Sequence, residues 1–275
     1  FSFFLASSRI LILIFLLKLL LKFSNAFSET LTTSSTLFFL IHSTFKINNL
    51  IFYKSTAFDL LKDSWPLIFS GAVLMIQARI DQIMIKEMIN STEVGYYSAA
   101  IRLIEAFGFI PVMLKISLYP SILNSRKDSN ELYQNRLLNF YRLNFLLFLA
   151  VAIPLFLFSE QIVNLLFGIE YQSVGILLSL MVIRLFFANM GVARSAYILN
   201  ENLMVFSLIT MTLGTITNIV LNYYWIPLYA SKGAIIATII SFIVSIFVVD
   251  IFYAKTRNNV ILQFKGIFSF YKLKV

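Results

Sequence analysis

The chain has 275 residues, of which 59% are hydrophobic and 13% are charged, with a formal net charge of +9 and no cysteine. Soluble domains are about 45–50% apolar and about 25% charged, so this composition, with a mean hydropathy of +0.85, excludes a soluble globular domain. The missing cysteines exclude disulfides and thiolate metal sites. The positive charge does not require a nucleic-acid partner, because the cytoplasmic loops of membrane proteins are enriched in basic residues.

The apolar runs predict an all-α membrane protein. They are far longer than the ~10-residue alternating strands of a membrane barrel, and helices are the other structure that satisfies its own backbone in lipid. The first two runs cover residues 3–23 and 27–45. Three basic residues inside the first run argue against the competing interpretation, a signal peptide. A polar cytoplasmic linker is expected at 47–63.

Two long apolar segments between Ser64 and Leu123 flank a polar turn at 90–93 and form a predicted helical hairpin. Charged residues lie inside both segments, and a lone charge at the centre of a bilayer costs at least ~2.5 kcal/mol. Counting from the turn places an acid and a base at matching depth on the two helices. We therefore expect two ion pairs across the hairpin, Asp81 with Arg102 and Arg79 with Glu105. Such pairs either merely join the two helices or line a polar cavity.

The rest of the chain continues this pattern. Pro111 is expected to kink the second helix of the hairpin. A polar loop is expected at 124–136, and a short apolar piece within 159–175 is expected to lie at the membrane interface. Further spans are predicted at 140–158, 176–197, 203–224 and 233–254. The total is about eight spans, each near the length that crosses a bilayer.

Basic residues outside the spans, together with Arg194 near the end of one span, gather on one side of the predicted bundle, which by the positive-inside rule is cytoplasmic. The opposite side holds mainly acidic loop residues, with Lys86 and Lys232 as its basic ones. The tail at 255–275 mixes apolar and basic residues and is expected to lie on anionic lipid headgroups in the cytoplasm. The basic residues on the cytoplasmic side are Lys46, Lys54, Lys62, Arg126, Lys127, Arg136, Arg194 and the tail lysines and arginine.

The polar residues within the spans indicate a transport function better than a catalytic one. No phosphate-binding glycine loop, H-E-x-x-H or G-x-S-x-G motif is present, so we expect no enzyme activity, cofactor or metal site. Basic groups dominate the spans, and guanidinium groups bind phosphate oxygens through paired hydrogen bonds. A phosphate or pyrophosphate cargo follows as a hypothesis. For the asparagines in the spans, hydrogen bonding between helices is the simpler interpretation.

Five segments, in this order between Ser64 and Leu123, carry a resemblance to a known family: WPLIFSG, RIDQIMI, VGYYSAAIRLIE, IPVM and LYPSIL. Together they resemble the Wzx-type polysaccharide flippases, including those of O-antigen and lipopolysaccharide synthesis, in the superfamily that also holds multidrug exporters and lipid II flippases. The resemblance implies two pseudo-symmetric lobes with about twelve helices in all. On that map, residues 1–46 are the last two helices of the first lobe, 64–254 form the six-helix second lobe and 255–275 the tail. About four helices are then missing, so an N-terminally truncated copy is expected.

The resemblance further implies that a lipid-pyrophosphate-linked oligosaccharide is moved by alternating access across the bacterial cytoplasmic membrane. Polysaccharide polymerase and glycosyltransferases are the expected protein partners. Two alternatives stay open: an exporter of small organic cations of the same superfamily, and a membrane-bound glycan polymerase or transferase. Asp81 and Glu105 are expected to exchange a proton or a sodium ion during transport. The predicted cavity and substrate-binding residues are Arg79, Asp81, Gln82, Arg102, Glu105, Arg184 and Asn189.

Overall fold

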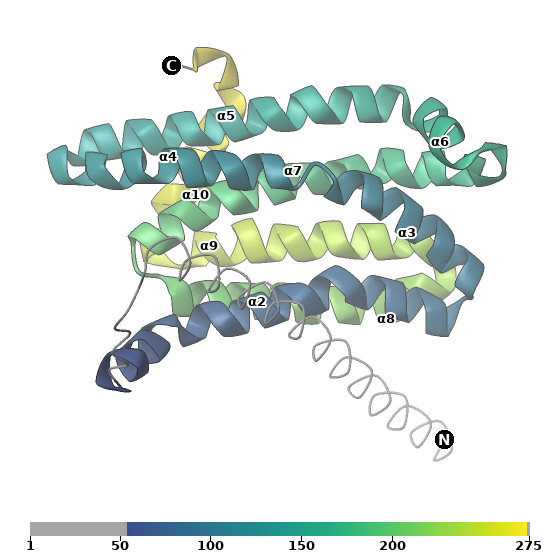
Figure 1. Ribbon diagram of the computed structural model, residues 1–275, viewed down its shortest axis with the longest axis horizontal. Helices are drawn as coiled ribbons and strands as arrows, with labels where there is room; N and C mark the ends of the chain where they lie inside the picture. Colours follow the sequence, from purple (N-terminus) through teal and green to yellow (C-terminus); the bar gives the residue numbers. More distant parts are fainter. Residues whose placement is uncertain (1–53, 274–275) are drawn as a thin grey trace, which may run out of the picture. The chain divides into compact units, whose positions relative to one another are not determined.

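The computed structural model describes residues 54–273, which form an all-α membrane protein without any strand in this range (Figure 1). Four of its helical stretches are long and apolar enough to cross a membrane: Ser64–Met88, Asn130–Leu157, Ile169–Asn200 and Met204–Phe252. The expected spans at 3–23 and 27–45 lie outside the described residues. By internal contacts the chain divides into two units, Phe1–Leu60 and Leu61–Val275, and the helical bundle belongs to the second.

The helices follow one another with very short connections. A π-helical turn, Val244–Val248, joins α8 to α9, and 3-10 turns lie at Ile169–Tyr171 and Phe270–Lys272. The helices are α2 (Lys54–Met88), α3 (Ser91–Glu105), α4 (Phe109–Asp128), α5 (Asn130–Leu157), α6 (Ser159–Phe167), α7 (Gln172–Asn200), α8 (Met204–Ile243), α9 (Val249–Phe252) and α10 (Ala254–Phe268).

Polar capping residues mark two of these connections. The Asn90 side chain accepts a hydrogen bond from the Glu93 amide at the start of α3, and Ser129 accepts one from the Leu132 amide at the start of α5. Such caps satisfy amides that have no partner within the helix. The polar loop expected at 124–136 is therefore wrong, because α4 and α5 meet at Ser129. Residues 54–63, expected to belong to a linker, are likewise helical.

The second helix of the predicted hairpin is interrupted close to the expected place. The helical path breaks between Glu105 and Phe109. Pro111 is buried in the first turn of α4, where its missing N–H would have had no intrahelical partner. The proline thus begins a new helix instead of bending a continuous one.

The longest stretch, Met204–Phe252, is a hairpin and not a single rod. Ala230 has φ 47° and ψ −132°, so the chain reverses there, between the spans expected at 203–224 and 233–254. Across the turn, a Cβ added to Gly233 would lie 2.4 Å from the carbonyl oxygen of Trp225, so only glycine fits. The Ser231 amide donates to the Glu93 side chain at 3.2 Å, which ties the turn to α3.

Helix α7 lies at the centre of the bundle and packs against α3, α4, α5, α6, α8 and α10. Two apolar clusters surround it, one that includes Tyr97 and Leu178 and another that includes Tyr141 and Phe247. In Figure 1 the long helices run side by side, while α10 crosses α5. The many exposed large apolar side chains, such as Phe69, Phe109 and Phe156, are what a lipid-facing surface requires.

Candidate functional site

A fully buried carboxylate lies between α2, α3 and the two halves of α8. Asp81 accepts hydrogen bonds from the Tyr97 hydroxyl at 2.6 Å, the Thr238 hydroxyl at 2.6 Å and the Asn222 amide at 2.7 Å. Asn222 also donates to Asn218, and Asn218 donates to Thr238. All five side chains are buried. We call these residues the Asp81 cluster.

The hydrogen-bond donors to this carboxylate are all neutral groups. Within residues 54–273 the ion pairs are Arg79–Glu105, Arg126–Glu201 and Arg194–Asp250, and none includes Asp81. The Asn222 side-chain oxygen has no hydrogen-bond partner in this part of the chain. One turn along α2, Gln77 donates to Ser241 at 3.0 Å and accepts from Thr215 at 3.4 Å. A polar ladder of side chains therefore joins α2 to the α8 hairpin.

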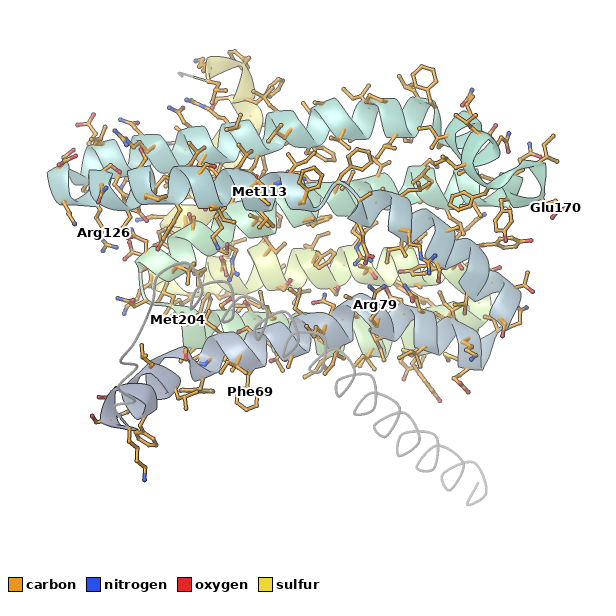
Figure 2. The ribbon with its side chains drawn as sticks, in the orientation of Figure 1. Phe69, Arg79, Met113, Arg126, Glu170 and Met204 are labelled. Carbon is orange, nitrogen blue, oxygen red and sulfur yellow. The ribbon has the colours of Figure 1, made fainter. Side chains whose placement is uncertain are left out.

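Of the two ion pairs expected across the α2–α3 hairpin, one forms. Arg79 and Glu105 lie 3.7 Å apart, with side chains 49% and 36% exposed, and Figure 2 shows Arg79 on α2. An ion pair this open contributes only about 0–1 kcal/mol, and a charge at the centre of lipid costs about 2.5–3.5 kcal/mol. The pair therefore contributes little to holding the two helices together.

The expected pair of Asp81 with Arg102 is wrong. Asp81 is buried in the Asp81 cluster, whereas Arg102 is exposed. A residue count from the turn gives the depth of a side chain along the hairpin but not its rotation about the helix axis. Tyr97 and Arg102 are five positions apart, about 140° around α3, so they lie on opposite faces. Arg102 and Glu105, three positions apart, share one face.

The other predicted site residues differ in burial and in their contacts. Gln82 and Arg184 are partly buried. Arg184 lies over the Phe242 ring, 5.9 Å from its centroid. Asn189 is buried and donates to the Leu185 carbonyl of its own helix at 2.8 Å, as expected for a structural asparagine. Two surface grooves, one along α10 and one near Tyr229, contain none of the predicted site residues.

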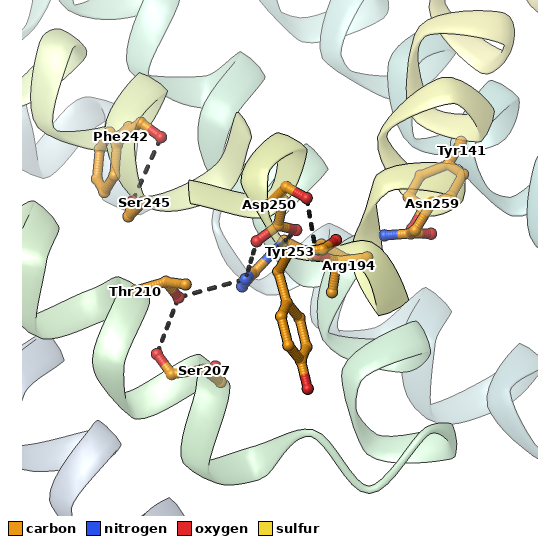
Figure 3. Close-up of polar contacts among 10 residues, drawn as sticks. Tyr141, Arg194, Ser207, Thr210, Phe242, Ser245, Asp250, Tyr253 and Asn259 are labelled. Atoms are coloured by element: carbon orange, nitrogen blue, oxygen red, sulfur yellow. Dashed lines mark hydrogen bonds and ion pairs between the residues drawn. The ribbon is translucent and has the colours of Figure 1, made fainter. Parts of the chain in front are cut away.

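Sequence reasoning missed a second buried charge cluster. Arg194 of α7 donates to both oxygens of Asp250, at 2.7 and 2.6 Å, and to Thr210 at 3.2 Å (Figure 3). The Asp250 backbone carbonyl accepts from Thr256 at 2.8 Å. The side chains of Arg194 and Asp250 are 4% and 0% exposed. Both residues lie near one end of predicted spans, which is the signal that could have indicated the pair.

The Asp81 cluster has the chemistry to hold a small cation. Its side-chain oxygens come from one carboxylate, two amides and hydroxyl groups, and hard cations prefer oxygen ligands. No group of three or more His, Cys, Asp or Glu residues that could hold a metal ion occurs between residues 54 and 273.

The fold and these clusters define a class: an all-α membrane protein with a buried, cation-compatible carboxylate and exposed charges on apolar helices. Residues 3–126 match a family model described as polysaccharide biosynthesis protein. The matched segment includes α2, α3 and most of α4, and so includes Arg79, Asp81, Arg102 and Glu105. This match supports a relationship with membrane proteins of polysaccharide biosynthesis. Comparisons with curated proteins and with solved structures give no match.

Proposed function

We propose that this protein transports a lipid-pyrophosphate-linked oligosaccharide across the bacterial cytoplasmic membrane by alternating access, as a Wzx-type flippase. The observation that carries the proposal is the exposed charged face of α2 and α3, with Arg79, Arg102 and Glu105, in the segment that matches polysaccharide biosynthesis proteins. Basic groups exceed acidic ones on this face. That balance suits a pyrophosphate better than an organic cation, so the small-cation exporter is less well supported.

In this mechanism the arginines hold the anionic headgroup while the lobes rock about it. Arg79 and Arg102 bind the pyrophosphate, and Arg184 supplies further positive charge from α7. Glu105 orients Arg79 through the 3.7 Å ion pair. The protein works as a transporter with polysaccharide polymerase and glycosyltransferases as partners, and it catalyses no covalent step.

The Asp81 cluster takes the coupling cation, a proton or a sodium ion. Binding there neutralises the carboxylate and draws its ligands toward the ion. Tyr97, Asn222 and Thr238 would have to exchange their hydrogen bonds to Asp81. Because those side chains belong to α3 and to both halves of α8, cation occupancy would change how α2 is held.

The cargo site is tested with the full-length gene product in cells that lack their own exporter. Arg79→Gln and Arg102→Gln should each lower surface glycan export about tenfold or more, since each removes a charge-assisted contact of about 1.5–3 kcal/mol. Lys127→Gln, an exposed change at the end of α4, should leave export unchanged. Normal export by both arginine variants, at wild-type protein levels, would refute the proposal.

The coupling site needs a separate measurement. Asp81→Asn keeps the size of the side chain and removes its charge, so the protein should fold but lose the dependence of glycan export on the proton or sodium gradient. Glycan export is measured in vesicles with each gradient imposed in turn. Gradient dependence equal to that of the wild type would remove Asp81 from the coupling step and leave the cargo assignment intact.

A further inference from the structure

Helix α10 buries polar side chains and exposes large apolar ones, alongside exposed basic residues. Its inner face carries Asn259 and Gln263, both fully buried, whereas Ile261, Phe264 and Phe268 are 50%, 42% and 75% exposed. A helix in water would bury its apolar face instead. An exposed apolar face on a basic helix is typical of helices that lie at a lipid surface.

The position of α10 is fixed by polar contacts with α5. The Tyr141 hydroxyl donates to Asn259 at 2.7 Å, and the Arg142 guanidinium donates to the Ser269 hydroxyl at 3.0 and 2.9 Å. Gly266 packs so closely that an added Cβ would lie 2.6 Å from the Tyr141 Cβ. Contacts on both sides of its midpoint therefore hold α10 in place, with its outer surface exposed.

A groove of about 450 Å³ runs along this outer surface, between α9 and α10. Arg257 and Lys265 border it and are exposed. The Arg257 Nε donates to the Ile251 carbonyl at 3.0 Å, which leaves the two terminal nitrogens directed elsewhere. The floor of the groove is apolar and is formed by Ile251, Val260, Ile261, Phe264 and Phe268.

The charge around the groove is of one sign. Residues 251–275 contain no aspartate or glutamate. The nearest acid in sequence, Asp250, is buried and paired with Arg194, and Lys265 makes no ion pair within residues 54–273. An apolar floor with two cations at its border is complementary to one class of ligand, a lipid with an anionic headgroup.

We propose that this groove binds an anionic phospholipid of the cytoplasmic leaflet. Its phosphate is held by Arg257 and Lys265, which lie about 12 Å apart along the helix, a separation that two long side chains span from either end. Its acyl chains cover Ile261, Phe264 and Phe268. Because the lining of the groove is apolar throughout, with the charged groups of Arg257 and Lys265 outside it at the border, the groove has no hydrogen-bonding group with which to recognise a sugar, and the occupant is a phospholipid and not the glycan-linked cargo.

The test uses the full chain in nanodiscs that contain equal amounts of phosphatidylglycerol and phosphatidylcholine. Native mass spectrometry measures the lipid that stays bound after release. The wild type should retain phosphatidylglycerol preferentially. The double variant Arg257→Gln/Lys265→Gln should retain about 25-fold less, because each basic residue near an anionic lipid contributes about fivefold.

Two matched variants separate the groove from general charge effects. Lys62→Gln/Lys127→Gln makes the same change in net charge at exposed positions away from α10 and should retain the lipid. Arg257→Lys/Lys265→Arg should retain it as well, and equal thermal unfolding midpoints confirm that all variants are folded. Phe264→Ser, which shortens the floor, should weaken retention without altering charge.

Three results would overturn the proposal. Equal loss in Lys62→Gln/Lys127→Gln would leave only general attraction to a negative surface. Equal retention of phosphatidylcholine by the wild type would remove the role of the headgroup. Displacement of phosphatidylglycerol by an equimolar polyprenyl diphosphate, dependent on Arg257 and Lys265, would assign the groove to the cargo lipid. None of these readouts uses glycan export, so they are independent of the proposed transport function.

Discussion

The buried pair of Arg194 and Asp250 illustrates why a single charge inside this bundle cannot be removed without consequence. Both carboxylate oxygens accept from the guanidinium, and Thr210 accepts a further bond from it. Taking two ions out of water is costly, and the pair mainly recovers that cost. The pair itself therefore adds little stability, but loss of one partner is costly because it leaves the other as an unpaired buried charge.

This argument predicts the stability of three variants. Arg194→Met or Asp250→Leu alone should lower the free energy of unfolding by about 3–5 kcal/mol, because each leaves an unpaired buried charge. The double variant Arg194→Met/Asp250→Leu should be more stable than either single variant. Thermal and denaturant unfolding in detergent micelles would measure the coupling. Additive losses in the double variant would contradict the argument.

The sequence predicts the depth of a side chain along a helix, but it predicts a contact only where the two side chains also point toward each other. Arg79 and Glu105 were expected as a pair and form one. Asp81 was expected beside Arg102 but bonds to Tyr97, Asn222 and Thr238, because partners on α8 are far away in sequence. Arg194 and Asp250 are 56 positions apart. The reversal of the chain at Ala230 falls between two predicted spans, but the rotation of each helix that brings these two side chains together has no local pattern in the sequence.

At the scale of elements, the position of α10 depends on its close contact with α5. A side chain at position 266 would collide with the Tyr141 Cβ and backbone. Gly266→Leu should therefore separate α10 from α5 while the other helices remain folded. Limited trypsin digestion should then cleave after Arg257 and Lys265 several times faster than in the wild type, and the cleavage rates can be followed by mass spectrometry.

Gly71→Leu is the matched control for this variant. Gly71 lies in α2, where an added Cβ would meet no atom within 4 Å, so leucine should be accommodated there and leave the digestion unchanged. An undisturbed digestion pattern in Gly266→Leu would mean that α5 yields to the larger side chain and that the two helices are less tightly coupled than their distance indicates.

The helices were more predictable than the connections between them. Apolar runs indicated α5, α7 and both halves of α8, since each is long enough to span a bilayer. The polar stretch around Ser129 was expected to be a loop, but polar residues with a good capping serine continue a helix beyond the membrane. The π-helical turn at Val244–Val248 and the break at Tyr253 have no local sequence signal, because they follow from packing against α7 and α10.

At the scale of the whole molecule, the distribution of basic residues predicts one orientation in the membrane. The chain has no cysteine, so a single introduced cysteine reports the accessibility of its own position. In right-side-out vesicles, Lys232→Cys should react with a membrane-impermeant maleimide. Lys127→Cys should react only after the vesicles are opened, because the positive-inside rule places α4's end in the cytoplasm.

Wild-type protein, which should not be labelled before or after opening, controls for background. Labelling of Lys127→Cys in sealed vesicles together with protection of Lys232→Cys would reverse the orientation. That result would place the α10 groove in the outer leaflet and remove the cytoplasmic assignment of its lipid.

The all-α membrane class was predictable from composition alone, since so apolar a chain with so few charges has few other stable forms. The arrangement of two lobes, by contrast, is implied by the resemblance of 64–123 to flippases, and its first lobe would include residues 1–46, outside the described range.

The tight turn of the α8 hairpin also has a mechanical consequence. The reversal at Ala230 and the close approach of Gly233 to the Trp225 carbonyl join the two halves of α8 at one end, so we expect them to move together as one hairpin. Helix α2 is joined to this hairpin by exchangeable side-chain hydrogen bonds through Gln77 and Asp81. We therefore expect a displacement of Asp81 to shift α2 along the α8 hairpin before it separates the two halves of α8.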